Sequence, residues 1–142
     1  MSTRSGAVAL LFMLYCVQVA NSGWKPAKGT PYPAFISCVS SNLCIFVSCR
    51  RGGERSFEIY SVENGLSAGD TLSLSAAGRQ IKLTVPPRTN NELYSWPLRP
   101  DIDELLSSGG KAAIVFDERT KWPVRTHGYA SAKSSLSRQC KG

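Results

Sequence analysis

The basic residues are the side chains whose types and spacing point most directly to chemistry. Three short segments concentrate them beside glycine or aromatic residues: Arg50, Arg51 and Arg55 around Gly52-Gly53; Arg119, Lys121 and Arg125 beside Trp122; and Lys25 and Lys28 flanking Trp24. Loop tips supply binding residues disproportionately, and arginine near aromatic rings suits recognition of phosphate, carboxylate or acidic surfaces. Charge kept for solubility, which also discourages edge-to-edge pairing of strands, is the competing interpretation. The candidate binding residues are Arg50, Arg51, Arg55, Arg119, Lys121, Trp122 and Arg125.

No catalytic constellation is predicted. His127 is the only histidine, which excludes any site that needs two, and a histidine at a strand end is its simplest interpretation. Asp101, Asp103 and Glu104 lie close together, but they fall where a helix is expected to begin, and the helix dipole favours acidic residues there. We therefore expect a non-enzymatic protein with no catalytic residues, no metal and no cofactor.

Residues 1–22 have the organisation of an export signal. Arg4 supplies a positive charge, Ala7 to Val17 is an unbroken apolar run, and Ala20-Asn21-Ser22 places small residues before a cleavage point. The run is too short to cross a bilayer, which needs about 20 residues. We predict a secretory signal peptide cleaved after Ser22, followed by a single disulfide-stabilised, β-rich domain over residues 23–142. A buried N-terminal helix and a lipoprotein modified at Cys16 are the alternatives.

The cysteines suit an oxidising compartment. Four remain after removal of the signal, and this even number predicts two disulfides: Cys38, Cys44, Cys49 and Cys140. A zinc site is the competing interpretation, but two paired Cys-x2–4-Cys knuckles are missing. The Cys-x-x-Cys motif of redox enzymes is also missing.

Hairpin register selects a pairing among these cysteines. Strands are expected at residues 35–39 and 43–49, and a three-residue loop, Ser40-Ser41-Asn42, places Cys38 opposite Cys44. Cys49 has the opposite parity, so it points to the other face of the hairpin and is left for Cys140. The predicted bonds are therefore Cys38–Cys44 and Cys49–Cys140.

Short strands separated by turn signals make up most of the remaining chain. Further strands are predicted at residues 56–62, 71–75, 80–85, 93–96, 111–117 and 122–127, with Leu72 facing Leu83 and Leu74 facing Ile81. Asp101 can cap a short helix that ends at Gly109-Gly110, and Tyr129, Ala132, Leu136 and Cys140 form a helical stripe. We predict an all-β fold, a β-sandwich or partly open barrel of about seven strands, with a short inserted helix and a C-terminal helix.

The C-terminal half resembles the invasion-associated locus B family of small exported alphaproteobacterial proteins. The resemblance rests on Trp96-Pro97-Leu98, Ile102, Leu105-Leu106, Gly109-Gly110-Lys111, the strand Ala112 to Phe116, and the segment Val124 to Leu136. It implies an exported all-β domain without enzymatic activity, linked to envelope or host-cell interaction. The chain departs from the family pattern by lacking a mid-chain cysteine pair before the Pro-Leu segment and by carrying Cys140. A neighbouring group of small exported proteins matches nearly as well.

Two functions follow from these features. The first is an exported, non-enzymatic binding module of the bacterial envelope, in the periplasm, on the outer membrane or outside the cell. It would recognise a protein or an anionic envelope or host-surface component, as the net charge of +7 suggests. No transmembrane segment is expected in the mature form, and nucleic acid is not an expected partner because export makes other polyanions more accessible. The alternative is an inhibitor of a secreted hydrolase, a protease or lysozyme, with a rigid hairpin tip inserted into the target's cleft.

Overall fold

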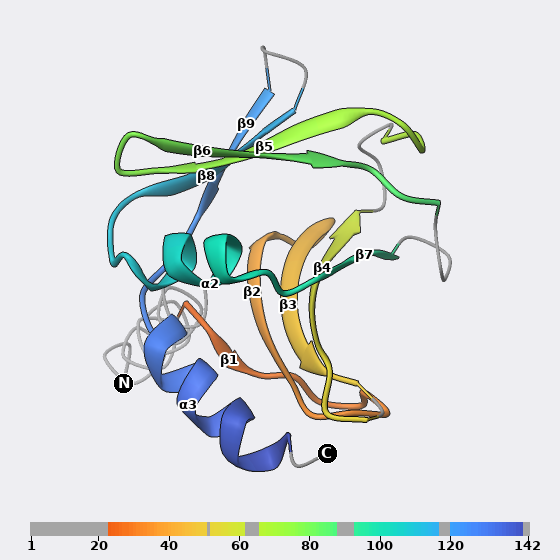
Figure 1. The fold of residues 1–142 in the computed structure, drawn as a ribbon, viewed down its shortest axis with the longest axis vertical. Coiled ribbons are helices and arrows are strands. Elements are labelled where there is room, and N and C mark those ends of the chain that lie inside the picture. The colour runs from red at the N-terminus through yellow and green to blue at the C-terminus, as the bar shows by residue number, and fades with distance from the viewer. Residues whose placement is uncertain (1–22, 51, 62–65, 88–92, 117–119, 141–142) are drawn as a thin grey trace, which may run out of the picture.

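Two antiparallel sheets pack face to face in the computed structural model, which describes residues 23–50, 52–61, 66–87, 93–116 and 120–140. The five-stranded sheet has the order β1-β2-β3-β4-β7 and contains β1 (Lys25–Pro26), β2 (Ala34–Ser40), β3 (Leu43–Cys49), β4 (Arg55–Ser61) and β7 (Leu93–Pro97). The four-stranded sheet has the order β6-β5-β8-β9 and contains β5 (Thr71–Ala76), β6 (Arg79–Thr84), β8 (Ala112–Phe116) and β9 (Thr120–Val124). The fold is a sandwich and not a closed barrel, so the predicted fold class is confirmed (Figure 1).

Two helices complete the described part of the chain. The inserted helix α2 (Pro100–Ser107) packs against β5 and β6, and α3 (Tyr129–Gln139) packs against β2 and β3. Both were predicted, and their apolar faces are buried as the sequence pattern requires. Figure 1 shows α2 near the open side of the two sheets and α3 beside β1.

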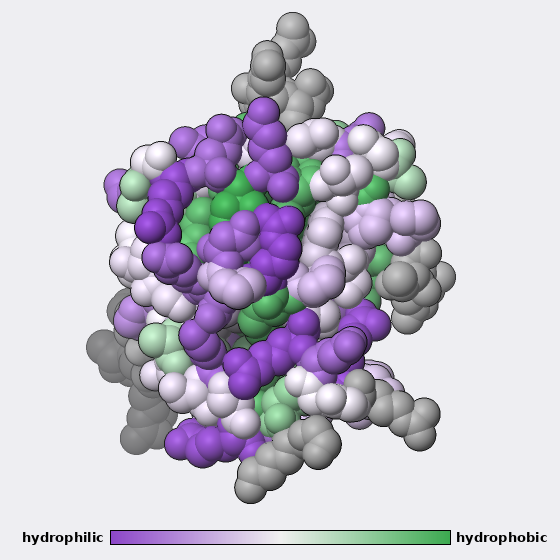
Figure 2. All heavy atoms as spheres, in the orientation of Figure 1, coloured by the Kyte–Doolittle hydropathy of each residue, from purple (hydrophilic) through white to green (hydrophobic). Residues whose placement is uncertain are grey.

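Strand alternation builds the core. Ile45, Phe57 and Ile59 point inward from the five-stranded sheet and are fully buried, and Leu74 and Ile114 meet them from the four-stranded sheet. Burying each such side chain stabilises the fold by about 1.5–3 kcal/mol. Figure 2 shows that hydrophilic side chains cover most of one face of the molecule, while apolar groups are visible mainly in hollows between them.

The predicted registers are confirmed. Leu72 pairs with Leu83 and Leu74 with Ile81 across β5 and β6. Cys38 pairs with Cys44, but the hairpin turn is tighter than predicted. Ser40 pairs with Leu43, and a β-bulge between Cys38 and Ser40 restores the register that a three-residue loop would have given.

Both predicted disulfides are present. Cys38–Cys44 joins directly opposite residues of β2 and β3, with a Cα–Cα distance of 4.0 Å. Cys49–Cys140 joins the end of β3 to the residue that follows α3. The second bond fixes the last turn of α3 to the five-stranded sheet, as the parity of Cys49 predicted.

Two boundaries differ from the sequence prediction. The last strand begins at Thr120 and ends at Val124, so residues 125–128 form a connection instead of continuing the strand to His127. The cap of α2 is Arg99 and not Asp101, because Pro100 occupies the first helical position, where its missing N–H costs nothing. Asp101 nevertheless accepts the backbone N–H of Ile102 at 2.9 Å.

Candidate anion-binding groove

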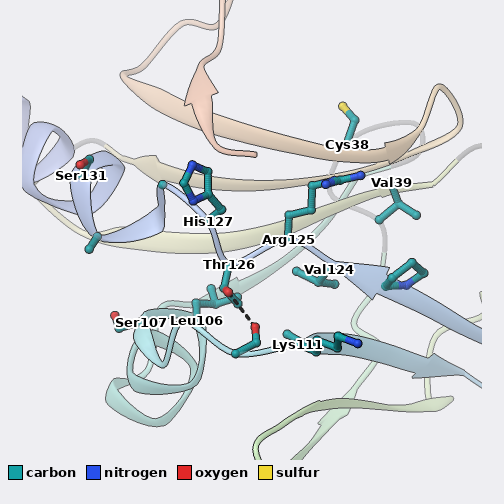
Figure 3. Close-up of a pocket in the computed structure, with 16 residues that line it drawn as sticks. Cys38, Val39, Leu106, Ser107, Lys111, Val124, Arg125, Thr126, His127 and Ser131 are labelled. Carbon is teal, nitrogen blue, oxygen red and sulfur yellow. Dashed lines mark hydrogen bonds between the residues drawn. The ribbon is translucent and has the colours of Figure 1, made fainter. Parts of the chain in front are cut away.

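A groove of about 1090 Å³ lies where the end of β2 approaches β9. It is lined by Cys38 and Val39 from β2, Gly109–Lys111 before β8, Pro123 and Val124 from β9, the connection Arg125–Gly128, and the ends of α2 and α3. Figure 3 shows these walls meeting around the side chains of Arg125 and His127, with Arg125 extending toward Cys38 and Val39. Segments distant in sequence therefore form one concave surface.

The buried side chain of Trp24 holds the connection from behind. Its indole Nε1–H donates to the carbonyl of Arg125 at 2.8 Å, and its backbone N–H donates to the carbonyl of His127 at 3.3 Å. The same ring meets Tyr129 edge-on, with ring centroids 5.2 Å apart. Because the backbone is tied down on its inner side, the side chains of Arg125 and His127 remain exposed on the groove side.

Close backbone approach also requires a glycine behind the groove. Gly23 has φ +68°, and a Cβ built on it would lie 2.3 Å from the carbonyl oxygen of His127. No other residue type fits this position without moving the connection. On the other side, the buried Thr126 donates its hydroxyl to the carbonyl of Gly110 at 2.7 Å, which joins two walls of the groove (Figure 3).

Asp103 connects the two helices that border the groove. Its carboxylate accepts the phenol of Tyr129 at 2.7 Å and the ammonium group of Lys133. Burial, reinforced by the hydrogen bond to Asp103 and its negative charge, raises the pKa of Tyr129 far above its ordinary value, while the positive charge of Arg55 opposes this. The phenol therefore stays protonated and keeps donating to Asp103 throughout the neutral range.

Positive charge dominates the groove. The exposed side chains of Lys111 and Arg125 supply this charge, and no carboxylate is among the described residues that line the groove. The exposed His127 lies beside them. The acidic residues of α2 do not line this hollow and have their own partners. Asp101 pairs with Arg99, whose hydrogen bond lowers the pKa of Asp101, and Glu104 pairs with Arg79 at 2.9 Å.

A second hollow continues the first. It has a volume of about 620 Å³, shares Lys111, Ala112 and Pro123 with the groove, and adds Lys121, Gln80 and Arg79. No carboxylate is among the described residues that line this hollow either. We call the two hollows together the basic groove, because its described charged lining is cationic throughout.

The second predicted basic cluster is only partly brought together. Lys121 and Arg125 line the basic groove. Trp122 points to the other face of β9, where its ring stacks on Phe116 with centroids 5.9 Å apart, so it packs against the core. Arg119 lies outside the described residues.

The first predicted basic cluster is separated by the sheet. Arg50 folds onto the outer face of the five-stranded sheet and forms an ion pair with Glu58 at 2.9 Å. Arg55 has the parity of the inward-pointing Phe57 and lies near enough to Tyr129 to affect its pKa. Arg51 lies outside the described residues. At the third cluster, Trp24 is buried while Lys25 and Lys28 are exposed.

Sequence reasoning missed Lys111, which lines both parts of the basic groove. It follows Gly109-Gly110 directly, and this isolated lysine has no basic neighbours in the sequence to mark it. The segments that join it to Arg125 are brought together only by the packing of β8 against β9.

One serine lies in a motif typical of hydrolases. Residues 65–69 read Gly-Leu-Ser-Ala-Gly, but such a nucleophile needs a strand-to-helix turn that exposes it. Here the motif precedes β5, a strand, and Ser67 lies in a turn closed by Asp70 N–H donating to its carbonyl at 3.0 Å. From Leu66 onward, the described residues of this segment form a turn that leads into the β5–β6 hairpin.

Comparisons with protein-family models, with curated proteins and with solved structures found no match to this chain. The resemblance to the invasion-associated locus B family remains a prediction from the sequence. Within the described residues, no group of three or more metal-binding side chains comes together, and no helix is long and apolar enough to cross a membrane.

Proposed function

We propose that this protein is an exported, non-enzymatic binding module that recognises a phosphate-bearing anionic component of the envelope through the basic groove. One observation carries the proposal: Lys111, Lys121, Arg125 and His127 line two hollows that share Lys111, Ala112 and Pro123, and no described lining residue is acidic. Basic side chains converging in a concave site raise the local concentration of an anionic ligand. The partner is therefore expected to be an anionic lipid or glycolipid.

The scaffold supports binding because it fixes the groove before the ligand arrives. Trp24, Thr126 and the Asp103 contacts anchor the segments that carry the basic side chains. A preorganised site loses less conformational entropy on binding than a flexible one. The two disulfides also fit a chain that folds in an oxidising compartment.

A triple substitution tests the groove. We expect Lys111→Gln/Lys121→Gln/Arg125→Gln to weaken binding to phosphatidylglycerol vesicles and to lipopolysaccharide by roughly tenfold or more, since each surface charge contributes about 0.5–1 kcal/mol. Vesicle co-sedimentation gives the affinity for the lipid, and titration calorimetry gives it for lipopolysaccharide. Phosphatidylcholine vesicles serve as the uncharged comparison.

A matched control separates the groove from net charge. Lys25→Gln/Lys28→Gln/Arg138→Gln removes the same charge from exposed positions that do not line the basic groove. We expect this variant to bind almost as tightly as the native protein. Equal losses in both variants, or no binding to either anionic probe, would overturn the proposal.

Export has its own test. Non-reducing mass spectrometry of the protein made in its native host should give the mass of residues 23–142, less the hydrogens lost in forming Cys38–Cys44 and Cys49–Cys140. An uncleaved mass with free thiols contradicts export and moves nucleic acid up the list of anionic partners.

A further inference from the structure

Glu58 is a carboxylate buried where a sheet usually meets solvent. Its neighbours Phe57 and Ile59 point into the core, so Glu58 points to the outer face of the five-stranded sheet. Only 6 % of the residue is nevertheless exposed. Arg50 and the segment Thr30–Tyr32, which line the same hollow, surround it.

Three hydrogen bonds hold this carboxylate in place and leave one acceptor position of the oxygen that faces Arg50 unused. Glu58 accepts from the hydroxyls of Ser48 and Ser56 and from the Arg50 guanidinium at 2.9 Å. Arg50 also donates to Ser56 at 3.1 Å and to Ser95 at 3.0 Å. The Arg50 side chain remains 40 % exposed, so part of its guanidinium still faces the hollow.

Stability alone does not explain such a pair. A buried ion pair contributes little net free energy, because removing both charges from water offsets their attraction. Charged groups fixed by several strands are, however, well suited to orient a ligand. Glu58 lies on β4 and Ser95 on β7, and Arg50 directly follows the last residue of β3, so three neighbouring strands of one sheet fix the pair.

The hollow above the pair has the character of a small-ligand site. Its volume is about 380 Å³, and its walls are mainly apolar, including Tyr32, Phe46, Leu93 and Pro31. Tyr32 is 43 % exposed and is the exposed large hydrophobic residue of the described chain. Apolar walls with a few convergent polar groups are the general pattern of ligand pockets.

We propose that this hollow binds a neutral sugar unit of a glycan. The Arg50–Glu58 pair is neutral overall, so a charged ligand attracted by one partner is repelled by the other. Sugar hydroxyls can accept from Arg50 and donate to Glu58, and the C–H face of the ring can pack on Tyr32. This site does not depend on the proposed function, since it shares no lining residue with the basic groove.

Nuclear magnetic resonance titration of the isotope-labelled full protein tests the site. The probes are neutral trisaccharides of glucose, mannose and N-acetylglucosamine, with a trisaccharide of a hexuronic acid as the charged comparison. We expect at least one neutral probe to give saturable amide shifts centred on Tyr32, Phe46 and Leu93. The proposal would be overturned if no neutral probe changed the amide shifts, if the acidic trisaccharide bound more tightly, or if the shift changes were centred on Lys111 and Arg125.

Variants locate the binding energy. Tyr32→Ala should weaken the bound neutral trisaccharide at least tenfold, and Glu58→Gln should weaken it similarly. Tyr60→Ala is the control, because Tyr60 is a half-buried tyrosine on the same sheet face that does not line the hollow. The variant Lys111→Gln/Lys121→Gln/Arg125→Gln should bind the neutral trisaccharide with unchanged affinity. Failure of the sugar proposal can therefore be distinguished from failure of the anion proposal. Equal effects of Tyr32→Ala and Tyr60→Ala contradict the assignment.

Discussion

Individual residues behind the groove decide whether its basic side chains are correctly placed. Gly23 and Trp24 have no charged side chains, yet they hold the backbone that presents Arg125 and His127. The functional part of the basic surface is therefore set by residues that a search for charge does not select. At this scale, Gly23→Ala tests the backbone geometry behind the groove, and Tyr129→Phe tests the effect of a buried, protonated phenol.

Gly23→Ala should destabilise the protein and weaken anion binding. The new Cβ would lie 2.3 Å from the carbonyl oxygen of His127, so the connection or the N-terminal backbone has to shift, and the expected cost is about 2–3 kcal/mol. Gly29→Ala is the matched control, because Gly29 has φ +77° with no atom near a built Cβ. Denaturant unfolding of both variants measures the difference, and equal costs would refute the steric argument.

Tyr129→Phe should change how stability depends on pH in the alkaline range. Because burial raises the pKa of Tyr129 in the folded state above the ordinary 10.0, the phenol stabilises the native protein fully below pH 10. That contribution is lost as the pH rises further, since the unfolded chain ionises first. The free energy of unfolding of the unsubstituted protein should therefore exceed that of Tyr129→Phe by about 1 kcal/mol at neutral pH, and this difference should shrink above pH 10. Denaturant unfolding of both proteins between neutral pH and the alkaline range measures this difference. A difference that does not change with pH would contradict the contribution of the buried phenol.

At the scale of elements, the two disulfides constrain the chain differently. Cys38–Cys44 closes a local hairpin, with a sequence separation of 6, whereas Cys49–Cys140 spans a separation of 91 and fixes α3 to β3. The longer loop restricts the unfolded chain more strongly. Helix α3 also carries Tyr129 and Lys133, so its anchoring affects one wall of the groove.

Removing each bond separately should show this difference. We expect Cys49→Ala/Cys140→Ala to lower the free energy of unfolding by about 4–5 kcal/mol and Cys38→Ala/Cys44→Ala by about 2 kcal/mol. Chemical denaturation of the two double variants gives the values. A larger loss from the local pair would contradict the loop-length argument.

The faces and pairings of residues in the strands were predictable because side chains alternate between the two faces of a strand with a period of two residues. The parity of Cys44 and Cys49 determined which faces they occupy, and the apolar pattern determined the pairing of Leu72 with Leu83. The position of Arg50 was not predictable, since its partner Glu58 looks like any solvent-facing residue of an alternating strand. Lys111 and Arg125 flank the open end of the β8–β9 hairpin, where Ala112 pairs with Val124, whereas Cys38 and Val39 of β2 reach the groove only through contacts between segments distant in sequence.

For the whole molecule, charge is distributed unevenly instead of being spread for solubility alone. No described carboxylate lines the basic groove: Asp101 and Asp103 are paired away from it, and Glu104 pairs with Arg79 at its edge, which leaves Lys111, Lys121 and Arg125 as its other cations. An electrostatic contribution of this kind is screened by salt. The salt dependence of binding therefore reports on the groove as a unit.

Raising sodium chloride from about 0.05 M to about 0.3 M should weaken binding of the native protein to phosphatidylglycerol vesicles, because screening shortens the range of each charge. The groove variant Lys111→Gln/Lys121→Gln/Arg125→Gln should show a smaller change over the same range. Parallel salt dependences would argue for an interface elsewhere on the molecule.

The long-range disulfide also imposes an order on biosynthesis. Cys44 can meet Cys38 as soon as one hairpin has been made, but Cys49 must wait until β9 and α3 have followed it. Until then the Cys49 thiol, which is buried in the finished core, has no partner and can exchange with other thiols and disulfides. A chain that ends before α3 lacks Cys140, so its Cys49 cannot form this bond. Closure of this bond thus requires synthesis of the chain as far as Cys140.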